Sequence, residues 1–210
     1  PTFYSRAFNS AGTPRGESVQ AIDFDNTFNH LHNHTLASSR SGKAVITSYR
    51  CGSSGDGFVL QRFDRTGSRV EENHHFSGTC DYNFLAPAAV SPSGTMAVAW
   101  STESDREAGK RFLKMQYYTA AGDSMGPAVN INEAGTASFY FPCFNKMLVM
   151  KENGTSTVIW QDDRTGTRYI YMQQFDERGR KIGENYVVNR TWGASRPFIL
   201  CNGSDLTYAA

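Results

Sequence analysis

A fourfold repeat constrains the fold of this chain more than any other feature of its sequence. Each copy has an aromatic residue at the end of a strand-like segment, and these anchors are Phe8, Phe63, Tyr118 and Phe175. The anchors are 55, 55 and 57 residues apart. A glycine follows each anchor four positions later, and a glutamine precedes it by two positions in every copy except the first, where Arg6 stands. Because this register holds over the whole chain, it predicts four copies of one structural unit.

Each copy contains four short segments with the composition of β-strands. In the second copy they are "FVLQRF", "VEENHHF", "FLAPAAV" and "TMAVAW", separated by glycine, serine, asparagine and aspartate. No stretch shows helical periodicity, so the pattern indicates an all-β protein. Four-stranded units that recur every 50–60 residues are typical of β-propeller blades.

The sequence therefore predicts a single-domain, four-bladed β-propeller over residues 1–210, with about 52–57 residues in each blade. In this register the first segment, "PTFYSRAF", is the third strand of a blade, and the last, "DLTYAA", is the second strand of a blade. The two ends are complementary, so we expect strands from both termini to close the ring and remove its exposed edges.

One repeat carries a resemblance to known proteins. The segment "VIWQDDRTGTRYIYMQQFDERGRKIGENYVVN" resembles the tandem blade repeats in the β-propeller regions of bacterial-type secreted and cell-surface proteins. The shared pattern is a strand that ends in tryptophan, an aspartate-rich loop, an aromatic-Gln-aromatic strand and a D-x-x-G turn. The resemblance implies a propeller in an extracellular setting. Such propellers serve as lectins, adhesins and scaffolds, so the resemblance transfers no site.

Polar loops follow the second strand of three blades and are expected to lie on one face of the ring. They are "RCGSSGDG", "STESDREAGKR" and "QDDRTGTR". A rigid ring that presents polar loops is a plausible binding surface, and the candidate ligand-binding residues in these loops are Asp105, Arg106, Asp162, Asp163 and Arg164. The alternative is that these loops are ordinary solvated turns.

Three large aromatic residues stand next to these loops and are expected to occupy one structural position in three blades. They are Tyr49, Trp100 and Trp160. Exposed, they would offer a platform for the apolar face of a sugar ring, and repeated sites would give avidity for multivalent glycans. Buried, they would pack between blades. Both interpretations remain open from the sequence.

Composition narrows the classes of function. The formal net charge is +1 with interleaved signs, so nothing in the sequence favours a nucleic-acid partner. No apolar run approaches the roughly 20 residues of a membrane-spanning helix. No spacing is diagnostic of a metal or cofactor site, and no catalytic motif stands out, so we expect no cofactor, no metal and no catalytic residues.

The cysteines and sequons bear on localisation. Cys51 and Cys80 are expected to lie in loops on one face, where they are candidates for a disulfide bond, whereas Cys143 and Cys201 either pair or remain buried thiols. Four N-x-S/T sequons are compatible with secretion, although such triplets also arise by chance. We therefore expect a secreted or cell-surface protein.

The sequence favours a secreted, non-catalytic binding module, with carbohydrate as the ligand and a glycan or cell-surface molecule as the partner. A structural or protein-interaction propeller, acting as an adhesin or assembly scaffold and able to form homo-oligomers, is the main alternative. A glycoside hydrolase is the third hypothesis.

Overall fold

The computed structural model describes most of the chain. The described residues are 3–23, 28–52, 57–77, 86–105, 110–132, 139–140, 147–162, 164–189, 197–203 and 205–209. Within them every regular element is a β-strand, as the short alternating segments of the sequence predict. Among these residues there is no helix long and apolar enough to span a bilayer.

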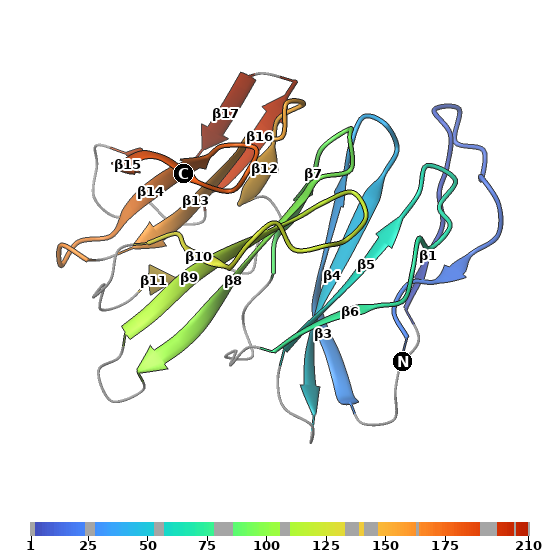
Figure 1. Cartoon of the computed structure of the whole chain (residues 1–210), viewed down its shortest axis with the longest axis horizontal. Coiled ribbons are helices and arrows are strands. Elements are labelled where there is room, and N and C mark those ends of the chain that lie inside the picture. Colours follow the sequence, from blue (N-terminus) through green and yellow to red (C-terminus); the bar gives the residue numbers. More distant parts are fainter. Residues whose placement is uncertain are drawn as a thin grey trace.

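The strands form three large sheets and two smaller ones (Figure 1). The first large sheet, here the Phe63 blade, contains β3 (Phe28–Ser38), β4 (Ala44–Gly52), β5 (Gly57–Phe63) and β6 (His74–Ser77). The second, the Tyr118 blade, contains β7 (Ala88–Val90), β8 (Met96–Asp105), β9 (Lys110–Tyr118) and β10 (Val129–Asn130). The third, the Phe175 blade, contains β11 (Phe139–Tyr140), β12 (Leu148–Met150), β13 (Ser156–Asp162), β14 (Tyr169–Phe175) and β15 (Lys181–Val187).

Two hairpins stand at the ends of this row of sheets. The N-terminal pair is β1 (Tyr4–Ser5) with β2 (Val19–Gln20), and the C-terminal pair is β16 (Phe198–Asn202) with β17 (Asp205–Ala209). All strand pairs are antiparallel neighbours, and the inner strands lie side by side, since β7 contacts β3 and β12, and β12 contacts β16. This is the blade order that the fourfold repeat predicts.

The repeated glycine forms the turn between the third and outer strands. The four glycines at this position, Gly12, Gly67, Gly122 and Gly179, have φ angles between +77° and +94°. Each donates its amide to the residue that follows the anchor, for example Gly179 N to Asp176 O at 3.0 Å. A residue with a Cβ resists this left-handed backbone, so the glycine repeat is confirmed as a turn requirement.

The repeated glutamine stabilises the hairpin formed by the third and outer strands of its blade. The Gln61 amide donates to the carbonyl oxygen of Glu71 at 2.9 Å, and the Gln173 amide donates to that of Gly183 at 3.3 Å. Gln116 makes the equivalent bond to Gly126, and Arg6 substitutes with Nε donating to Gly16 O at 3.1 Å. The glutamine therefore satisfies backbone carbonyls at or just before the start of the outer strand, which explains its recurrence.

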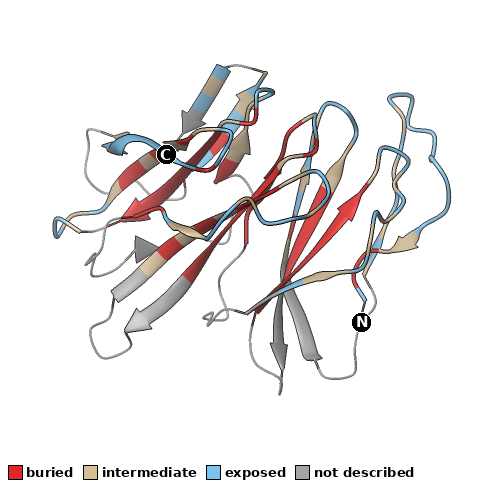
Figure 2. Ribbon diagram, in the orientation of Figure 1, coloured by how far each residue is buried: buried red, intermediate tan, exposed pale blue. Residues whose placement is uncertain are grey.

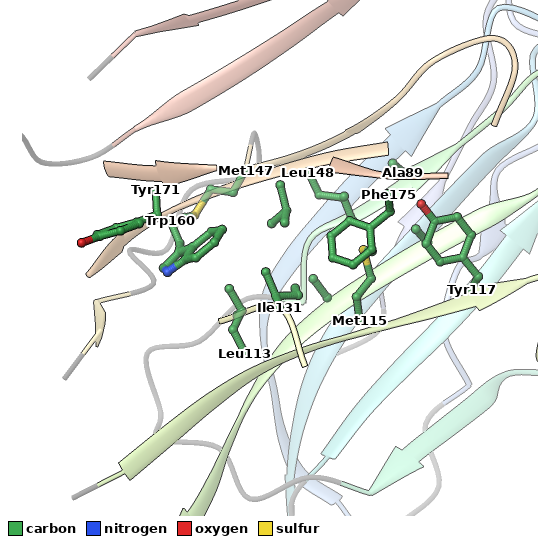
Figure 3. Close-up of a cluster of buried hydrophobic side chains, with 13 residues drawn as sticks. Ala89, Leu113, Met115, Tyr117, Ile131, Met147, Leu148, Trp160, Tyr171 and Phe175 are labelled. Atoms are coloured by element: carbon green, nitrogen blue, oxygen red, sulfur yellow. The ribbon is translucent and has the colours of Figure 1, made fainter. Parts of the chain in front are cut away.

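The anchor aromatics are buried between adjacent sheets. Figure 2 shows that buried residues lie mainly in the strands of the large sheets. Phe63, Tyr118 and Phe175 are 4%, 8% and 0% exposed. Phe175 belongs to the largest apolar cluster, where it packs with Met115, Leu148 and other residues of the Tyr118 and Phe175 blades (Figure 3). Each anchor faces the preceding blade, since Phe63 packs with residues of the N-terminal pair. Burial of these rings between blades is a main source of the fold's stability.

The expected closure of the ring by strands from both termini is not present in the described structure. β1 pairs with β2 and β17 pairs with β16, in two separate sheets. Figure 1 shows these two pairs at opposite ends of the row of blades. Within the described residues the chain therefore does not bring its two ends together.

Candidate functional site

The connections between strands fall on two faces of the structure. One set of tight turns joins the inner strand of each blade to its second strand, and another set joins the third strand to the outer strand. The turns of the first set are closed by backbone hydrogen bonds such as Gly154 N to Lys151 O at 3.0 Å. The connections from the second to the third strand leave the opposite end of each sheet (Figure 1), and these contain the predicted ligand-binding residues. We call the two ends the turn face and the loop face.

The register of the sheets corrects one prediction about the aromatic residues. Trp100 pairs with Lys114 and Trp160 pairs with Tyr171, each four residues before its anchor. In the Phe63 blade the residue at that position is Ser48, which pairs with Val59, whereas Tyr49 lies one residue further along. Tyr49 therefore does not share the register position of the two tryptophans, and its side chain is not among those described.

The two tryptophans are packing residues. Trp160 is 0% exposed and Trp100 is 8% exposed, and Ser48 at the same position is also buried. The Trp160 ring stacks on Tyr171, with centroids 6.0 Å apart and planes 25° apart (Figure 3). The interpretation as an exposed sugar platform is therefore wrong for Trp100 and Trp160 in this structure, and the alternative of packing between blades describes both.

Three of the predicted ligand-binding residues do meet at the loop face of the Phe175 blade. Asp162 ends β13 and is fully buried, and its Oδ2 atom accepts a hydrogen bond from Trp160 Nε1 at 3.2 Å. Arg164 Nη2 and Nε donate to the same oxygen at 2.6 and 3.0 Å. The backbone amide of Arg164 donates to Asp162 Oδ1 at 2.8 Å. The buried carboxylate thus has a charged partner and hydrogen bonds on both oxygens.

Arg164 extends this cluster to the neighbouring strands. Its guanidinium carbon lies 4.2 Å from the centroid of the Tyr171 ring, which is a cation–π arrangement, and its Nη1 donates to Asn185 Oδ1 at 3.2 Å. Asn185 Nδ2 donates to Ile131 O of the Tyr118 blade at 3.0 Å. The cluster joins the loop after β13 to two blades. Its chemistry is that of a fixed support, because the Asp162 oxygens are occupied by internal donors.

The sequence analysis did not identify the asparagines that donate hydrogen bonds to two of the repeated glutamines. Asn73 and Asn185 lie twelve residues after Gln61 and Gln173, and each donates through Nδ2 to the glutamine Oε1 at 2.7 Å. Asn73 also accepts from the backbone amide of Asp23 at 2.7 Å, so both asparagines reach the preceding blade or pair. The feature of the sequence that could have identified these asparagines is their common spacing of twelve residues from the glutamine, which occurs in only two copies.

A second ion pair joins the segment that follows the N-terminal pair to the Phe63 blade. Arg69 Nη1 donates to Asp23 Oδ1 at 2.6 Å, and Arg69 Nη2 pairs with Asp23 Oδ2. The hydrogen bond from Arg69 holds the pKa of Asp23 below its ordinary value. The pair is half exposed, so its contribution to stability is small.

Several predicted residues lie where the structure describes no side chain. Arg106, Asp163 and Cys80 lie outside the described residues, and the side chains of Asp105 and Cys51 are not described, so the Cys51–Cys80 disulfide stays a prediction. Cys201 is a free thiol whose Sγ lies 3.3 Å from Gly203 O. Burial raises the pKa of this thiol.

Three cavities lined by described residues lie away from the predicted ligand-binding residues. One of about 310 Å³ lies between the Tyr118 and Phe175 blades, lined by residues that include Tyr117, Pro127 and Arg178. Another of about 250 Å³ lies between the Phe63 and Tyr118 blades near Phe63 and Met96. Among the residues whose side chains are described, no group of three or more His, Cys, Asp or Glu is placed to hold a metal ion.

Comparison with solved structures defines the class of fold. The α-L-arabinanase of Penicillium chrysogenum, solved with arabinobiose, matches with a TM-score of 0.56 and 15% identity, over 87% of this chain and 59% of that chain. The Hadza microbial sialidase Hz136 matches with a TM-score of 0.52 and 14% identity, over 82% and 39%. A protein of unknown function from Dyadobacter fermentans matches with a TM-score of 0.51 and 12% identity, over 85% and 59%.

These likenesses give the chain a β-propeller fold, in agreement with its repeated four-stranded sheets. The chain spans less than two thirds of the length of each of these three structures. No protein-family model matches the sequence, and no curated protein does.

Proposed function

We propose that this propeller is a secreted, non-catalytic carbohydrate-binding module that engages glycans through its loop face. The observation that carries the proposal is the shared fold, over more than four fifths of this chain, with an arabinanase solved with arabinobiose and with a sialidase. A fold alone does not assign a function, so the proposal also uses the chemistry of the loop face.

The Asp162–Arg164 cluster supports the loop that would contact the ligand. Because both Asp162 oxygens accept internal hydrogen bonds, the carboxylate fixes the start of the loop after β13. Asp163 is the next residue, and Asp105 and Arg106 belong to the corresponding connection of the Tyr118 blade. A rigid support for a ligand-contacting loop reduces the entropy lost on binding. We therefore assign ligand contact to these three residues and a supporting role to Asp162.

Glycoside hydrolysis is a second candidate, because two of the structural neighbours are an arabinanase and a sialidase. Hydrolysis requires two carboxyl groups at a set separation across the glycosidic bond. In the described part of the loop face Asp162 is paired with Arg164 and buried, which suits neither a general acid nor a nucleophile. The binding module is therefore the better-supported proposal.

A glycan array, followed by titration calorimetry with arabino-oligosaccharides and sialylated oligosaccharides, tests this proposal. We expect selective binding that is weakened at least tenfold by Asp163→Ala and by Arg106→Ala. Arg178→Ala, an exposed turn-face substitution, is the matched control and should leave affinity unchanged. Release of free sugar from the bound oligosaccharide would establish the hydrolase instead. Folded protein that binds no glycan would overturn both.

A further inference from the structure

The cavity of about 310 Å³ between the Tyr118 and Phe175 blades has an apolar wall and a rim of arginines. Its rim is the turn of residues 178–180 in the Phe175 blade, on the turn face. Both blades contain inner, second, third and outer strands, so the cavity lies within the row of sheets and not at an end of it. The wall belongs to the Tyr118 blade and contains Met115, Tyr117, Met125, Pro127 and Val129.

The wall of this cavity suits an aromatic ring. Figure 3 shows Met115 and Tyr117 projecting from β9 toward the Phe175 blade. Met125 and Val129 pack beside them as partly buried residues. Methionine side chains adapt their shape to a ligand and make favourable contacts with the edge of an aromatic ring. An apolar cavity of about 150 Å³ accepts one benzene molecule, so this larger cavity has room for a fused ring that carries a small polar group.

The rim carries a positive charge that is not compensated at the cavity. The Arg178 side chain is exposed and makes no hydrogen bond or ion pair with any described residue. Arg180 Nε donates to Asp176 Oδ2 at 2.7 Å, so Asp176 compensates that arginine. Asp176 Oδ1 accepts the backbone amides of both arginines inside the turn, and Glu177 lies against Gly154 of the inner turn. Neither carboxylate lines the cavity, so Arg178 favours an anion there.

The other cavity between complete blades offers no such cation. In the cavity near Phe63 the charged lining includes Arg62 and Lys43. Arg62 Nη2 donates to Ala121 O at 2.9 Å and pairs with Glu71. Lys43 Nζ donates to Ser93 O at 2.7 Å. Both cations there hold the two blades together, whereas Arg178 has no such role among the described residues.

We propose that the cavity between the Tyr118 and Phe175 blades is a ligand site for a small aromatic carboxylate. The ring packs on the wall formed by Met115, Met125 and Val129, and the carboxylate accepts hydrogen bonds from the Arg178 guanidinium. A guanidinium matches the geometry of a carboxylate with two parallel N–H donors, and the apolar wall beside it strengthens these bonds by excluding water. The site lies on the turn face and does not rest on glycan binding at the loop face.

Titration calorimetry with 2-naphthoate, and with 2-naphthalenemethanol as its uncharged analogue, tests the proposal. We expect a Kd of about 1 mM or lower for 2-naphthoate, and binding about tenfold weaker for the alcohol. Arg178→Met keeps the apolar stem of the side chain and should weaken 2-naphthoate about tenfold without changing the affinity for the alcohol. Arg65→Met is the matched control, since Arg65 is an exposed arginine in the corresponding turn of the Phe63 blade and does not line the cavity.

Filling the cavity and mapping the contact provide the second half of the test. Met125→Trp should abolish binding of both compounds, because the indole occupies the place of the ligand ring. If that variant fails to fold, NMR of the wild type remains decisive, since 2-naphthoate should shift the amide signals of Met125 and Gly179 and leave that of Gly67 unchanged. A wild type that binds no 2-naphthoate, or an affinity that survives Arg178→Met, would overturn the proposal. Glycan affinity should be equal with and without 2-naphthoate, so failure at one site is distinguishable from failure at the other.

Discussion

Replacing Gly179 by alanine tests how closely the blades approach one another. Gly179 has a φ of +79°, and a Cβ built there would lie 2.8 Å from the Tyr117 ring of the preceding blade. Gly166 in the same blade has the same φ of +79° and nothing within 4 Å of its Cβ position. The two glycines share a backbone conformation and differ in their surroundings. Gly166→Ala is therefore the matched control for Gly179→Ala.

The structure sets the magnitude of each effect. Alanine in the left-handed region costs about 1–2 kcal/mol, and this is the whole cost expected for Gly166→Ala. Gly179→Ala adds overpacking against Tyr117, worth about 1–3 kcal/mol. The Tyr117 ring is only 3% exposed and its hydroxyl shares a hydrogen bond with Ser156, so it cannot move aside freely. We expect a total loss of about 2–5 kcal/mol in the free energy of unfolding.

Urea titration monitored by tryptophan fluorescence measures both variants and the wild type. A double-mutant cycle with Tyr117→Ala isolates the contact, since without the ring Gly179→Ala should cost no more than Gly166→Ala. Equal losses for Gly179→Ala and Gly166→Ala in the presence of Tyr117 would refute the reasoning. The turn glycine would then be required by its backbone angle alone.

Three further predictions concern the core, the turn face and covalent modification. Trp160→Ala should lower the free energy of unfolding in urea titration by about 3–5 kcal/mol, because removing a fully buried indole leaves a cavity. A loss below about 1 kcal/mol would show that the Trp160 side chain is not buried. The hydrogen bond from the Thr66 hydroxyl holds the pKa of Asp64 below its ordinary 3.8, so its stabilising contribution is complete above that pH and is lost as the pH falls through the folded-state pKa. Asp64→Asn should flatten the acid limb of the stability–pH curve, and an unchanged limb would contradict this. After secretion from a eukaryotic cell, peptide mapping should find a glycan on Asn153, which lies exposed in a tight turn, and none on Asn189, which is half-buried and accepts a hydrogen bond from the backbone of the neighbouring strand, Ile170 N, at 2.6 Å.

The repeat could be predicted from sequence because every blade imposes the same requirements at the same positions. A turn that needs positive φ selects glycine at Gly67 and Gly179, and a buried interface between sheets selects an aromatic at Phe63 and Phe175. Because each blade packs on its neighbour in the same way, these residues recur at nearly fixed spacing.

The position of Tyr49 could not be predicted because a strand pattern tolerates slippage by one residue. The segment "KAVITSYR" has serine at the position where the other blades have tryptophan, so an alignment on large aromatics moves it by one place. Only the pairing of Ser48 with Val59 fixes the register.

Which residues meet at the loop face, and whether the ring closes, depends on contacts between segments that the periodicity of the sequence does not reveal. Asp162 and Arg164 are close in sequence, and the structure brings their side chains together as an ion pair. Their role in ligand binding stays a prediction. That the carboxylate is buried beneath Trp160 follows only from the packing of three strands. The predicted closure by strands from both termini is not present in the described structure, where β1 pairs with β2 and β17 pairs with β16.

The glutamine bond inside each blade has a consequence for how the chain folds. Gln61 and Glu71, and likewise Gln173 and Gly183, are only ten residues apart. Such short-range contacts form quickly, since little chain entropy is lost in closing a loop of that size. The hairpin of third and outer strands can therefore acquire its register while the rest of the blade is still unfolded. The propeller would then grow during synthesis by adding hairpins that are already in register, and slow long-range pairing would be confined to the joints between them.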